Sequence, residues 1–231
     1  MINFLNFEKK TGIIFNDKNL LKQAFIHRSY INENPGTSLS HNERLEFLGD
    51  AVLELIVTLF LYKKYPEFTE GELTAIRSAL VNAVIISEVA SKIGMNDYLL
   101  LSKGESKDNG KARQYILANT YEAYVGAVYL DQGYEMADQF VHKFLLPQTE
   151  EIVRKKLWRD AKSLVQEKSQ EFLGVTPAYR VLHESGPDHD KHFTVGILFG
   201  KNLVAEGKGK SKQEAEVKAA EAAIVAKNWQ D

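Results

Sequence analysis

The sequence contains no cysteine, which excludes disulfide bonds and thiolate metal ligands. Because nothing in it requires an oxidising compartment, we expect a cytoplasmic protein. The first residues lack the basic start and the apolar run of a secretory signal. The longest apolar stretch, residues 51–62, is interrupted by Glu54 and falls short of the roughly 20 residues that cross a bilayer. We therefore expect no membrane partner.

The sequence also lacks a large charge of either sign. Its formal net charge is −2 over 231 residues, so a nucleic-acid partner would have to be bound by local basic patches. Apolar residues make up 44% and charged residues 26%, which is an ordinary globular balance. The length suits a domain of ordinary size followed by a smaller module, so we expect two domains.

Helical periodicity dominates the first part of the chain. Apolar residues recur at intervals of three and four from Asp17 to about Leu146, which predicts an all-α domain. The predicted helices span residues 41–65, 72–89 and 115–130. The apolar stripe of the first of these helices consists of Leu45, Leu48, Val52, Leu55, Leu59 and Tyr62. Glycines and charges predict an exposed, mobile loop over residues 102–111.

The pattern changes after the charged segment at residues 147–159. The predicted elements are a helix over 160–173, strands around 179–183, 193–199 and 202–206, and a helix over 212–228. Ser211 and Glu214 have the spacing of a capping box at the start of the last helix. The order α-β-β-β-α predicts a small α+β domain. The expected boundaries are 1–149 for the helical domain, 150–158 for a linker and 159–229 for the second domain.

Acidic residues share one face of the predicted helix over residues 41–65. They are Glu43, Glu46, Asp50 and Glu54. On the predicted helix over residues 115–130, Asn119 and Glu122 are one turn apart. They are followed by small residues that permit a close helix crossing, namely Ala123, Gly126 and Ala127. Such a crossing would bring Glu46, Asp50 and Glu122 together.

Carboxylate oxygens without histidine or cysteine nearby suit a hard cation such as Mg²⁺, which binds few protein groups and keeps several waters. Mg²⁺ bound in this way serves phosphate-ester chemistry. Spacing alone leaves open the alternative that these carboxylates form an ordinary solvated helix face.

Longer motifs support the catalytic alternative. Residues 41–53 (HNERLEFLGDAVL) resemble the signature segment of the ribonuclease III family almost letter for letter. Residues 24–30 are similar to the family's first helix, and residues 117–127 to its second catalytic segment. The α-β-β-β-α order and residues 207–216 (GKGKSKQEAE) resemble a double-stranded-RNA-binding domain. The resemblance covers nearly the whole chain.

This resemblance implies an endoribonuclease that hydrolyses phosphodiester bonds in double-stranded RNA and leaves 5′-phosphate and 3′-hydroxyl ends. It implies Mg²⁺ as the cofactor, for which Mn²⁺ is expected to substitute, and a homodimer formed through the helical domain. The expected roles are processing of ribosomal RNA precursors, structured messenger RNA and transfer RNA. DNA is not an expected partner.

Carried over position by position, the family's metal-binding residues match Glu46, Asp50, Asn119 and Glu122, with Asp50 and Glu122 as the catalytic pair. Flanking acids match Glu43 and Glu70. The family pattern has aspartate where this chain has Asn119, which keeps a carbonyl oxygen but loses the charge, so we expect weaker Mg²⁺ affinity. Phe47 matches the family's dimer-interface aromatic, with an ordinary core phenylalanine as the alternative.

In the second domain the resemblance implies a contact surface for duplex RNA. The residues are Lys162, Ser163, Gln166, Glu167, His189, Lys208, Lys210, Ser211 and Lys212. Gln166 and Glu167 would meet 2′-hydroxyls in one minor groove, His189 would enter the next, and the lysines would contact the phosphates between them. Without the resemblance, the lysine-rich run would be interpreted as a solvated turn.

Two other functions remain open at this point. The chain could be a catalytically weak or silent dimer that binds double-stranded RNA, because Asn119 replaces an acid. It could also be a structural dimer whose acidic helix face is merely solvated.

Overall fold

The computed structural model describes residues 3–107, 110–187 and 190–229. The chain divides into two compact units, Met1–Trp158 and Arg159–Asp231. The residues expected to form a linker, 150–158, include most of the last helix of the first unit. Within this segment Ile152 is buried, and the Trp158 ring lies 6.2 Å from that of Phe68.

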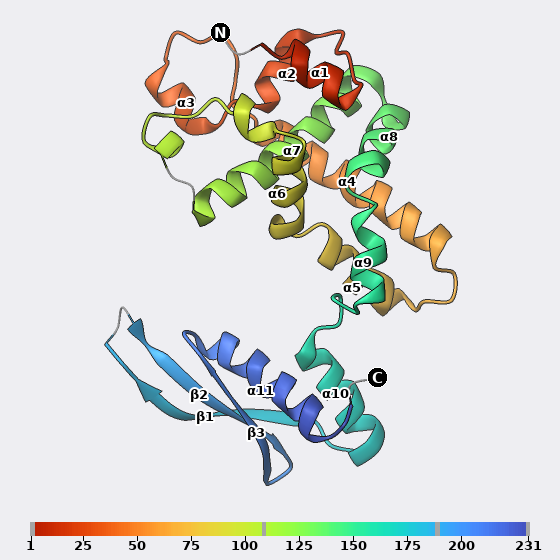
Figure 1. Ribbon diagram of the computed structural model, residues 1–231, viewed down its shortest axis with the longest axis vertical. Helices are drawn as coiled ribbons and strands as arrows, with labels where there is room; N and C mark the ends of the chain where they lie inside the picture. The colour runs from red at the N-terminus through yellow and green to blue at the C-terminus, as the bar shows by residue number, and fades with distance from the viewer. Residues whose placement is uncertain (1–2, 108–109, 188–189, 230–231) are drawn as a thin grey trace. The chain divides into compact units, whose positions relative to one another are not determined.

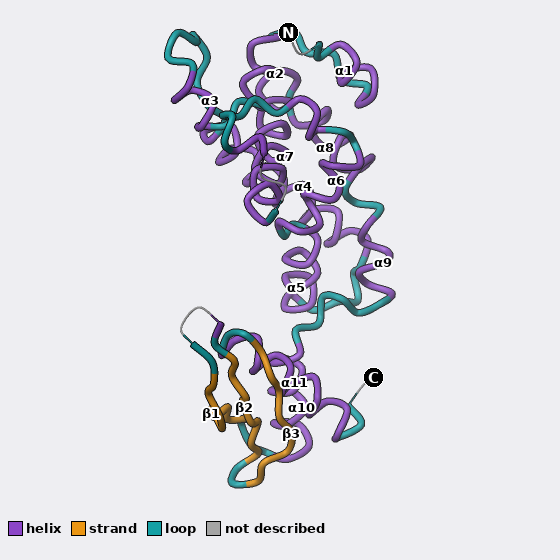
Figure 2. The backbone as a smooth tube through the Cα atoms, turned by 60° about the vertical axis from the view of Figure 1, so that its left-hand side comes forward, coloured by secondary structure: helices purple, strands orange, loops and turns teal. Residues whose placement is uncertain are grey.

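The described part of the first unit is helical, as predicted, and its only strand-like contact is an isolated bridge between Ile26 and Leu100 (Figures 1 and 2). Its elements are α1 (Leu5–Thr11), α2 (Lys18–Ala24), α3 (Arg28–Glu33), α4 (Glu43–Lys64), α5 (Glu70–Leu80), α6 (Ala83–Lys92), η1 (Met95–Tyr98), η2 (Glu105–Lys107), α7 (Lys111–Gln132), α8 (Tyr134–Phe144) and α9 (Gln148–Arg154).

The two longest helices, α4 and α7, pack against each other at the centre of this unit (Figure 1). Their backbones touch. A methyl group at Gly49 would overlap the carbonyl oxygen of Glu122, and one at Gly126 would overlap the carbonyl oxygen of Leu45. The close crossing predicted from Gly126 is therefore confirmed, and Gly49 supplies the other half of it.

Two sequence predictions for the helices were wrong. The helix predicted over residues 72–89 is two helices, because the Asn82 side chain accepts hydrogen bonds from the backbone N–H groups of Val84 and Ile85 and so starts α6. The apolar stripe predicted along α4 is buried only in part, since Leu55 and Tyr62 are 51% and 71% exposed. The C-terminal half of α4 instead buries Leu53, Ile56, Val57 and Leu61.

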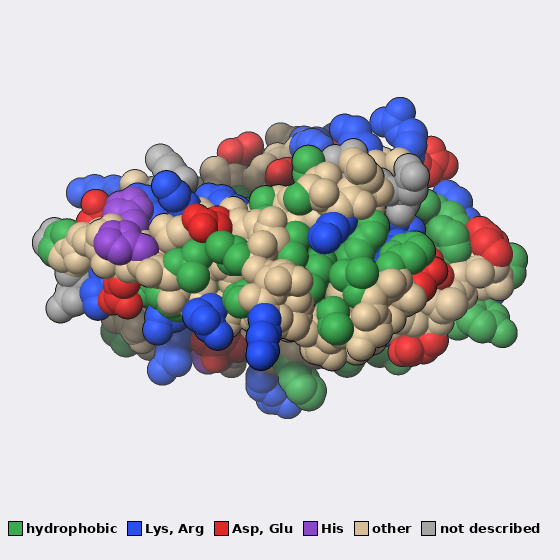
Figure 3. Space-filling model, turned by 90° about the horizontal axis from the view of Figure 1, so that it is seen from below, with side chains coloured by type: hydrophobic (Ala, Val, Ile, Leu, Met, Phe, Trp, Pro, Cys, Tyr) green, Lys and Arg blue, Asp and Glu red, His purple; other side chains and the backbone are tan. Residues whose placement is uncertain are grey.

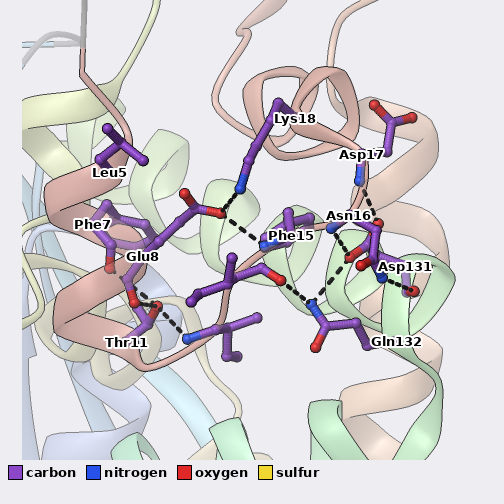
Figure 4. Close-up of polar contacts among 12 residues, drawn as sticks. Leu5, Phe7, Glu8, Thr11, Phe15, Asn16, Asp17, Lys18, Asp131 and Gln132 are labelled. Atoms are coloured by element: carbon purple, nitrogen blue, oxygen red, sulfur yellow. Dashed lines mark hydrogen bonds and ion pairs between the residues drawn. The ribbon is translucent and has the colours of Figure 1, made fainter.

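Two carboxylates fix the N-terminal segment, one within it and one on α7 (Figure 4). Glu8 is only 3% exposed, and its carboxylate accepts hydrogen bonds from Lys18 Nζ at 2.6 Å and from the Phe15 N–H at 2.8 Å. Asp131, near the end of α7, accepts backbone hydrogen bonds from Asn16 and Asp17 at 2.8 and 2.9 Å. The buried carboxylate of Glu8, with its two hydrogen-bond donors, therefore fixes the course of the loop between α1 and α2.

The second unit has the predicted α-β-β-β-α order. Its elements are α10 (Ala161–Leu173), β1 (Pro177–Ser185), β2 (His192–Phe199), β3 (Asn202–Gly209) and α11 (Lys212–Ala226). The strands form an antiparallel sheet in the order β1-β2-β3. The core between sheet and helices consists of Val165, Ile197, Phe199, Ala219, Ala220 and Ala223. The small alanine side chains let α11 approach β3 so closely that a methyl group at Gly207 would overlap the backbone of Ala219.

No single described helix is both long enough and apolar enough to cross a membrane. The pair of α5 and α6, which is bent by 47°, reaches the needed length and apolar composition when the two helices are taken together.

Replacing Glu8 with glutamine should lower the free energy of unfolding by about 2 kcal/mol, because a hydrogen bond to a buried charged group is worth roughly 1.5–3 kcal/mol. Urea titration at neutral pH measures this loss. Glu151→Gln is the control, because that carboxylate is exposed and pairs with Lys155, the residue just after α9, so a much smaller loss is expected. Equal losses in both variants would contradict the assigned role of Glu8.

Candidate active site and RNA-binding surface

The α4–α7 crossing places acidic side chains from both helices beside each other. Glu46 and Asp50 flank Gly49 on successive turns of α4, and the backbone of Glu122 contacts Gly49 directly. Glu122 and Glu46 are partly buried, whereas Asp50 is exposed. Two segments that lie more than 70 residues apart in sequence are thus brought together by one backbone contact.

The pKa values of Glu122 and Glu46 reflect the proximity of these carboxylates. Burial raises the pKa of Glu122 to about 7, and the negative charges of Asp50 and then Glu46 add to the rise. Burial also raises the pKa of Glu46, together with the charges of Glu43 and Asp50, while a hydrogen bond from the Asn119 side chain opposes this rise. The neighbouring carboxylates therefore make it harder for Glu122 and Glu46 to ionise.

None of Glu46, Asp50 and Glu122 forms an ion pair with a lysine or arginine in the described ranges. Carboxylate oxygens whose negative charge is not offset by a lysine or arginine are the ligands that a hard divalent cation prefers. Over the same ranges, no three acidic or histidine side chains are already gathered closely enough to enclose an ion. Mg²⁺ retains several waters and needs only one or two carboxylates directly. The donor set fits such an ion.

Of the other predicted acids, Glu43 lies beside this cluster, whereas Glu70 lies against the C-terminal half of α4, at least two turns beyond Asp50. Glu43 adds to the pKa rise of Glu46 and lies 4.0 Å from Arg28 and 3.7 Å from His41. Glu70 is exposed in the first turn of α5 and accepts a hydrogen bond from Thr74. It lines a cavity of about 450 Å³ between α4 and α5. Glu54, although on α4, contributes to neither raised pKa.

Sequence reasoning missed Gly49 and Asn42. A glycine inside a helix costs about 1 kcal/mol relative to alanine, so Gly49 between two acids was a signal of close packing. Asn42 is a polar residue at the helix start that is only 3% exposed, and its buried contacts could not be deduced from its position in the sequence.

The second unit presents the predicted lysine-rich run at the start of α11. Ser211 caps this helix, because its hydroxyl oxygen accepts the Glu214 N–H at 3.1 Å. The capping box is incomplete, since the Glu214 carboxylate accepts the N–H of Lys210 instead of that of Ser211. Lys208, Lys210 and Lys212 are exposed, and Lys210 Nζ is 3.9 Å from Asp190.

On α10, Gln166 and Glu167 are exposed, whereas Ser163 bonds to the helix-capping Asp160. Lys162 is occupied internally, because its ammonium pairs with Glu216 at 2.6 Å and lies 4.8 Å from the centre of the Tyr179 ring. His189 is outside the described residues. On the face drawn in Figure 3, lysine and arginine side chains are scattered among acidic and apolar ones, so no broad basic surface is visible there.

The fold and the two sites define a class of protein. A helical domain carries an acidic, oxygen-donor cluster at its central helix crossing, and a separate α-β-β-β-α domain presents lysines at a helix N-terminus. Sequence models of two known domains match these two parts. The match described as Ribonuclease-III-like covers residues 17–149, and the double-stranded RNA binding motif covers residues 161–225. The chain belongs to the ribonuclease III family.

Individual relatives agree with this assignment. The chain is 44% identical to a ribonuclease 3 of Borreliella burgdorferi over 95% of its own length and 89% of that protein. It is 41% identical to one of Nitratiruptor over 94% of each chain. A crystal structure of the nuclease domain of ribonuclease III from Campylobacter jejuni superimposes with a TM-score of 0.57 at 36% identity. It covers 64% of this chain and 97% of that domain.

The raised pKa of Glu122 predicts how the metal-free protein responds to pH. The pKa of this carboxyl is about 7 in the folded protein and ordinary in the unfolded chain, so the folded state binds more protons between these two values. The stability that the protonated carboxyl contributes is therefore lost as the pH rises towards and through 7. Removing the charge in Glu122→Gln should therefore raise the free energy of unfolding at pH 8. After discounting for partial exposure, we expect a gain of about 1–2 kcal/mol.

Urea titrations in EDTA at pH 4.5 and pH 8 measure this effect, and the gain should largely vanish at pH 4.5. Glu54→Gln, on the same helix, is the control and should change little at either pH. A gain at pH 8 no larger than that of the control would show that Glu122 is not under electrostatic strain.

Proposed function

We propose that this protein is a Mg²⁺-dependent endonuclease that cleaves both strands of double-stranded RNA and leaves 5′-phosphate and 3′-hydroxyl ends. The observation that carries the proposal is the approach of Glu46, Asp50 and Glu122 at the α4–α7 crossing, where the charges of Asp50 and Glu46 add to the raised pKa of Glu122. Precursors of ribosomal RNA, structured messenger RNA and transfer RNA are the expected substrates, and the cytoplasm is the expected location.

Asp50 and Glu122 would hold the ion, with Glu46 completing its surroundings, and Mn²⁺ would substitute for Mg²⁺. When bound, the ion supplies a water of lowered pKa and stabilises the leaving 3′ oxygen. The carboxylates bind and orient the ion, and no side chain of the chain itself has to act as the nucleophile. Glu43 and Glu70 would flank the scissile phosphate. Asn119 would contribute a carbonyl oxygen or, through its amide, orient Glu46.

The main alternative is a catalytically weak or silent duplex-RNA binder, which Asn119 favours because it removes one negative charge from the cluster. Against this alternative stands the electrostatic strain at Glu122 and Glu46. A purely RNA-holding protein has no need to keep neighbouring negative charges that raise the pKa values of Glu122 and Glu46.

Cutting both strands of a duplex requires two centres, which a symmetric homodimer supplies. An exposed apolar stripe along α4, which consists of Phe47, Leu55, Leu59 and Tyr62, supports this part of the proposal. Phe47 is 81% exposed and is therefore not an ordinary core residue. One solved structure of the Campylobacter jejuni nuclease domain describes flexibility in a region involved in dimer formation. We propose that the α4 stripe is the dimer contact.

In the second unit, Gln166 and Glu167 would meet 2′-hydroxyls, and Ser163 and Ser211 would lie beside the backbone. The proposed phosphate contacts are Lys208, Lys210 and Lys212. Lys162 would reach RNA only by giving up its contacts with Glu216 and Tyr179, so we assign it the weakest role.

Incubation of long double-stranded RNA with the full chain, with and without Mg²⁺, tests the activity. Short duplex products should form only with the metal, and Glu122→Gln should lower the rate by more than about 100-fold. That factor is the upper range for residues that merely support a metal ligand. Binding of the RNA in EDTA should be unchanged, since the lysines that bind phosphate are all retained.

Glu54→Gln serves as the control and should cleave at the normal rate. RNA binding without products in the unaltered protein would favour the silent binder. If the unaltered protein neither binds nor cleaves the RNA, that result would favour the structural dimer. Full activity in Glu122→Gln would refute the proposed metal site.

Replacing both Lys210 and Lys212 with alanine should weaken RNA binding and reduce the slope of log K against log[salt] by about 1 for each lysine that no longer neutralises a phosphate. Titrations of the full chain between low and moderate salt measure that slope. Lys201→Ala, at the opposite end of β3, removes an exposed lysine outside the surface and should leave the slope unaltered. An unchanged slope in the double variant would place the RNA elsewhere.

A further inference from the structure

The connection between α2 and α3 is bonded to both parts of the chain that lead into the acidic cluster. On one side, the Ile26 carbonyl accepts the N–H of Asn42, the residue just before α4, at 2.9 Å. On the other side, the Leu100 N–H donates to the Phe25 carbonyl at 2.9 Å, and the His27 N–H donates to the Leu100 carbonyl at 3.0 Å. Residues 25–27 therefore join the start of α4 to the segment that leads towards α7.

Side chains reinforce this junction on the Leu100 side. The N–H of Ser102 donates to the Ser29 hydroxyl oxygen at 3.0 Å, and that hydroxyl lies 2.8 Å from His27 Nδ1. Burial lowers the pKa of His27, which favours the neutral ring, and Nδ1 accepts the N–H of Ser29 at 3.3 Å. The junction is built from neutral, short-range hydrogen bonds.

Asn42 fixes the α4 side of the junction. An asparagine before a helix usually accepts an N–H of the first turn with its side chain, but Asn42 does not. Its side-chain Nδ2 instead donates to the Ala24 carbonyl at 3.1 Å, in surroundings that leave the residue only 3% exposed. The amide is used to attach the helix to the α2–α3 connection.

The same residue sets the first turn of α4. The Asn42 carbonyl accepts the N–H groups of Leu45 and Glu46, each at 2.9 Å. The position of the Glu46 backbone therefore follows that of Asn42, and Asp50 lies one turn further on. A buried amide with a single well-defined partner restricts such a position more tightly than apolar packing does.

We propose that Asn42 is a positioning residue for the metal-binding carboxylates, which holds the first turn of α4 so that Glu46 and Asp50 stay in register with Glu122. This inference rests on the proposed function. Asn42 touches neither substrate nor ion and acts through the backbone of Glu46. Partners that hydrogen-bond directly to metal ligands typically contribute 10- to 100-fold to metal affinity or activity, and we expect an effect at the lower end of that range for Asn42.

The test measures Mg²⁺ binding by calorimetry on the full chain, without RNA, in Asn42→Ala and Asn42→Asp. The aspartate keeps the shape of the side chain but cannot donate to the Ala24 carbonyl at neutral pH. Both variants should bind Mg²⁺ at least about 10-fold more weakly than the unaltered protein. Cleavage should need a correspondingly higher Mg²⁺ concentration, and RNA affinity in EDTA should stay the same.

Glu8→Gln is the matched control, because it should lose comparable stability by removing a buried hydrogen-bonding charge outside this junction. A merely structural role for Asn42 would give the same Mg²⁺ affinity in all three variants, and that result would overturn the proposal. Circular dichroism and thermal unfolding confirm the fold of each variant, and Asn42→Ser replaces Asn42→Ala if the alanine variant does not fold.

Failure of the positioning role and failure of the proposed function would give different results. If the unaltered protein neither binds Mg²⁺ nor cleaves RNA, the proposed function fails, and the positioning role fails with it. If the unaltered protein does both and the Asn42 variants match Glu8→Gln, only the positioning role fails.

Discussion

Backbone contact between α4 and α7 at Gly49 and Gly126 is the constraint on which the candidate site depends. Side chains larger than hydrogen at these positions would drive the helices apart, and the carboxylates carried by the two helices would separate with them. The glycines cost helix stability, but they let main-chain atoms touch where ordinary helix pairs keep axes 8–10 Å apart. The acidic cluster is thus a property of the crossing and not of either helix alone.

Holding like charges together is unfavourable, and the structure shows where that cost appears and what opposes it. The raised pKa values of Glu122 and Glu46 record the repulsion. We have proposed that the buried amide of Asn42 opposes this repulsion by holding the first turn of α4 in place. A divalent cation would relieve the same repulsion, so metal binding and the stability of this region are coupled.

The fold class and most elements could be predicted because hydrophobic spacing and capping residues are local signals. The helix at Glu43–Lys64 and the α-β-β-β-α order followed directly from them. The break at Asn82 was missed because apolar periodicity continues across it. The exposure of Leu55, Leu59 and Tyr62 could not be predicted, because periodicity does not distinguish an apolar face that meets the core from one that is left for another surface.

The sequence by itself determined which chemical groups are available. Its carboxylates at helical spacing, small residues on a second helix and lysines before a last helix are all visible in the printed chain. Only the tertiary structure decided how these groups are used. It brought Glu122 beside Asp50, raised its pKa, and turned the Asn42 amide away from capping and towards Ala24. The reason is physical, since distance and burial between residues remote in sequence arise only when the helices pack.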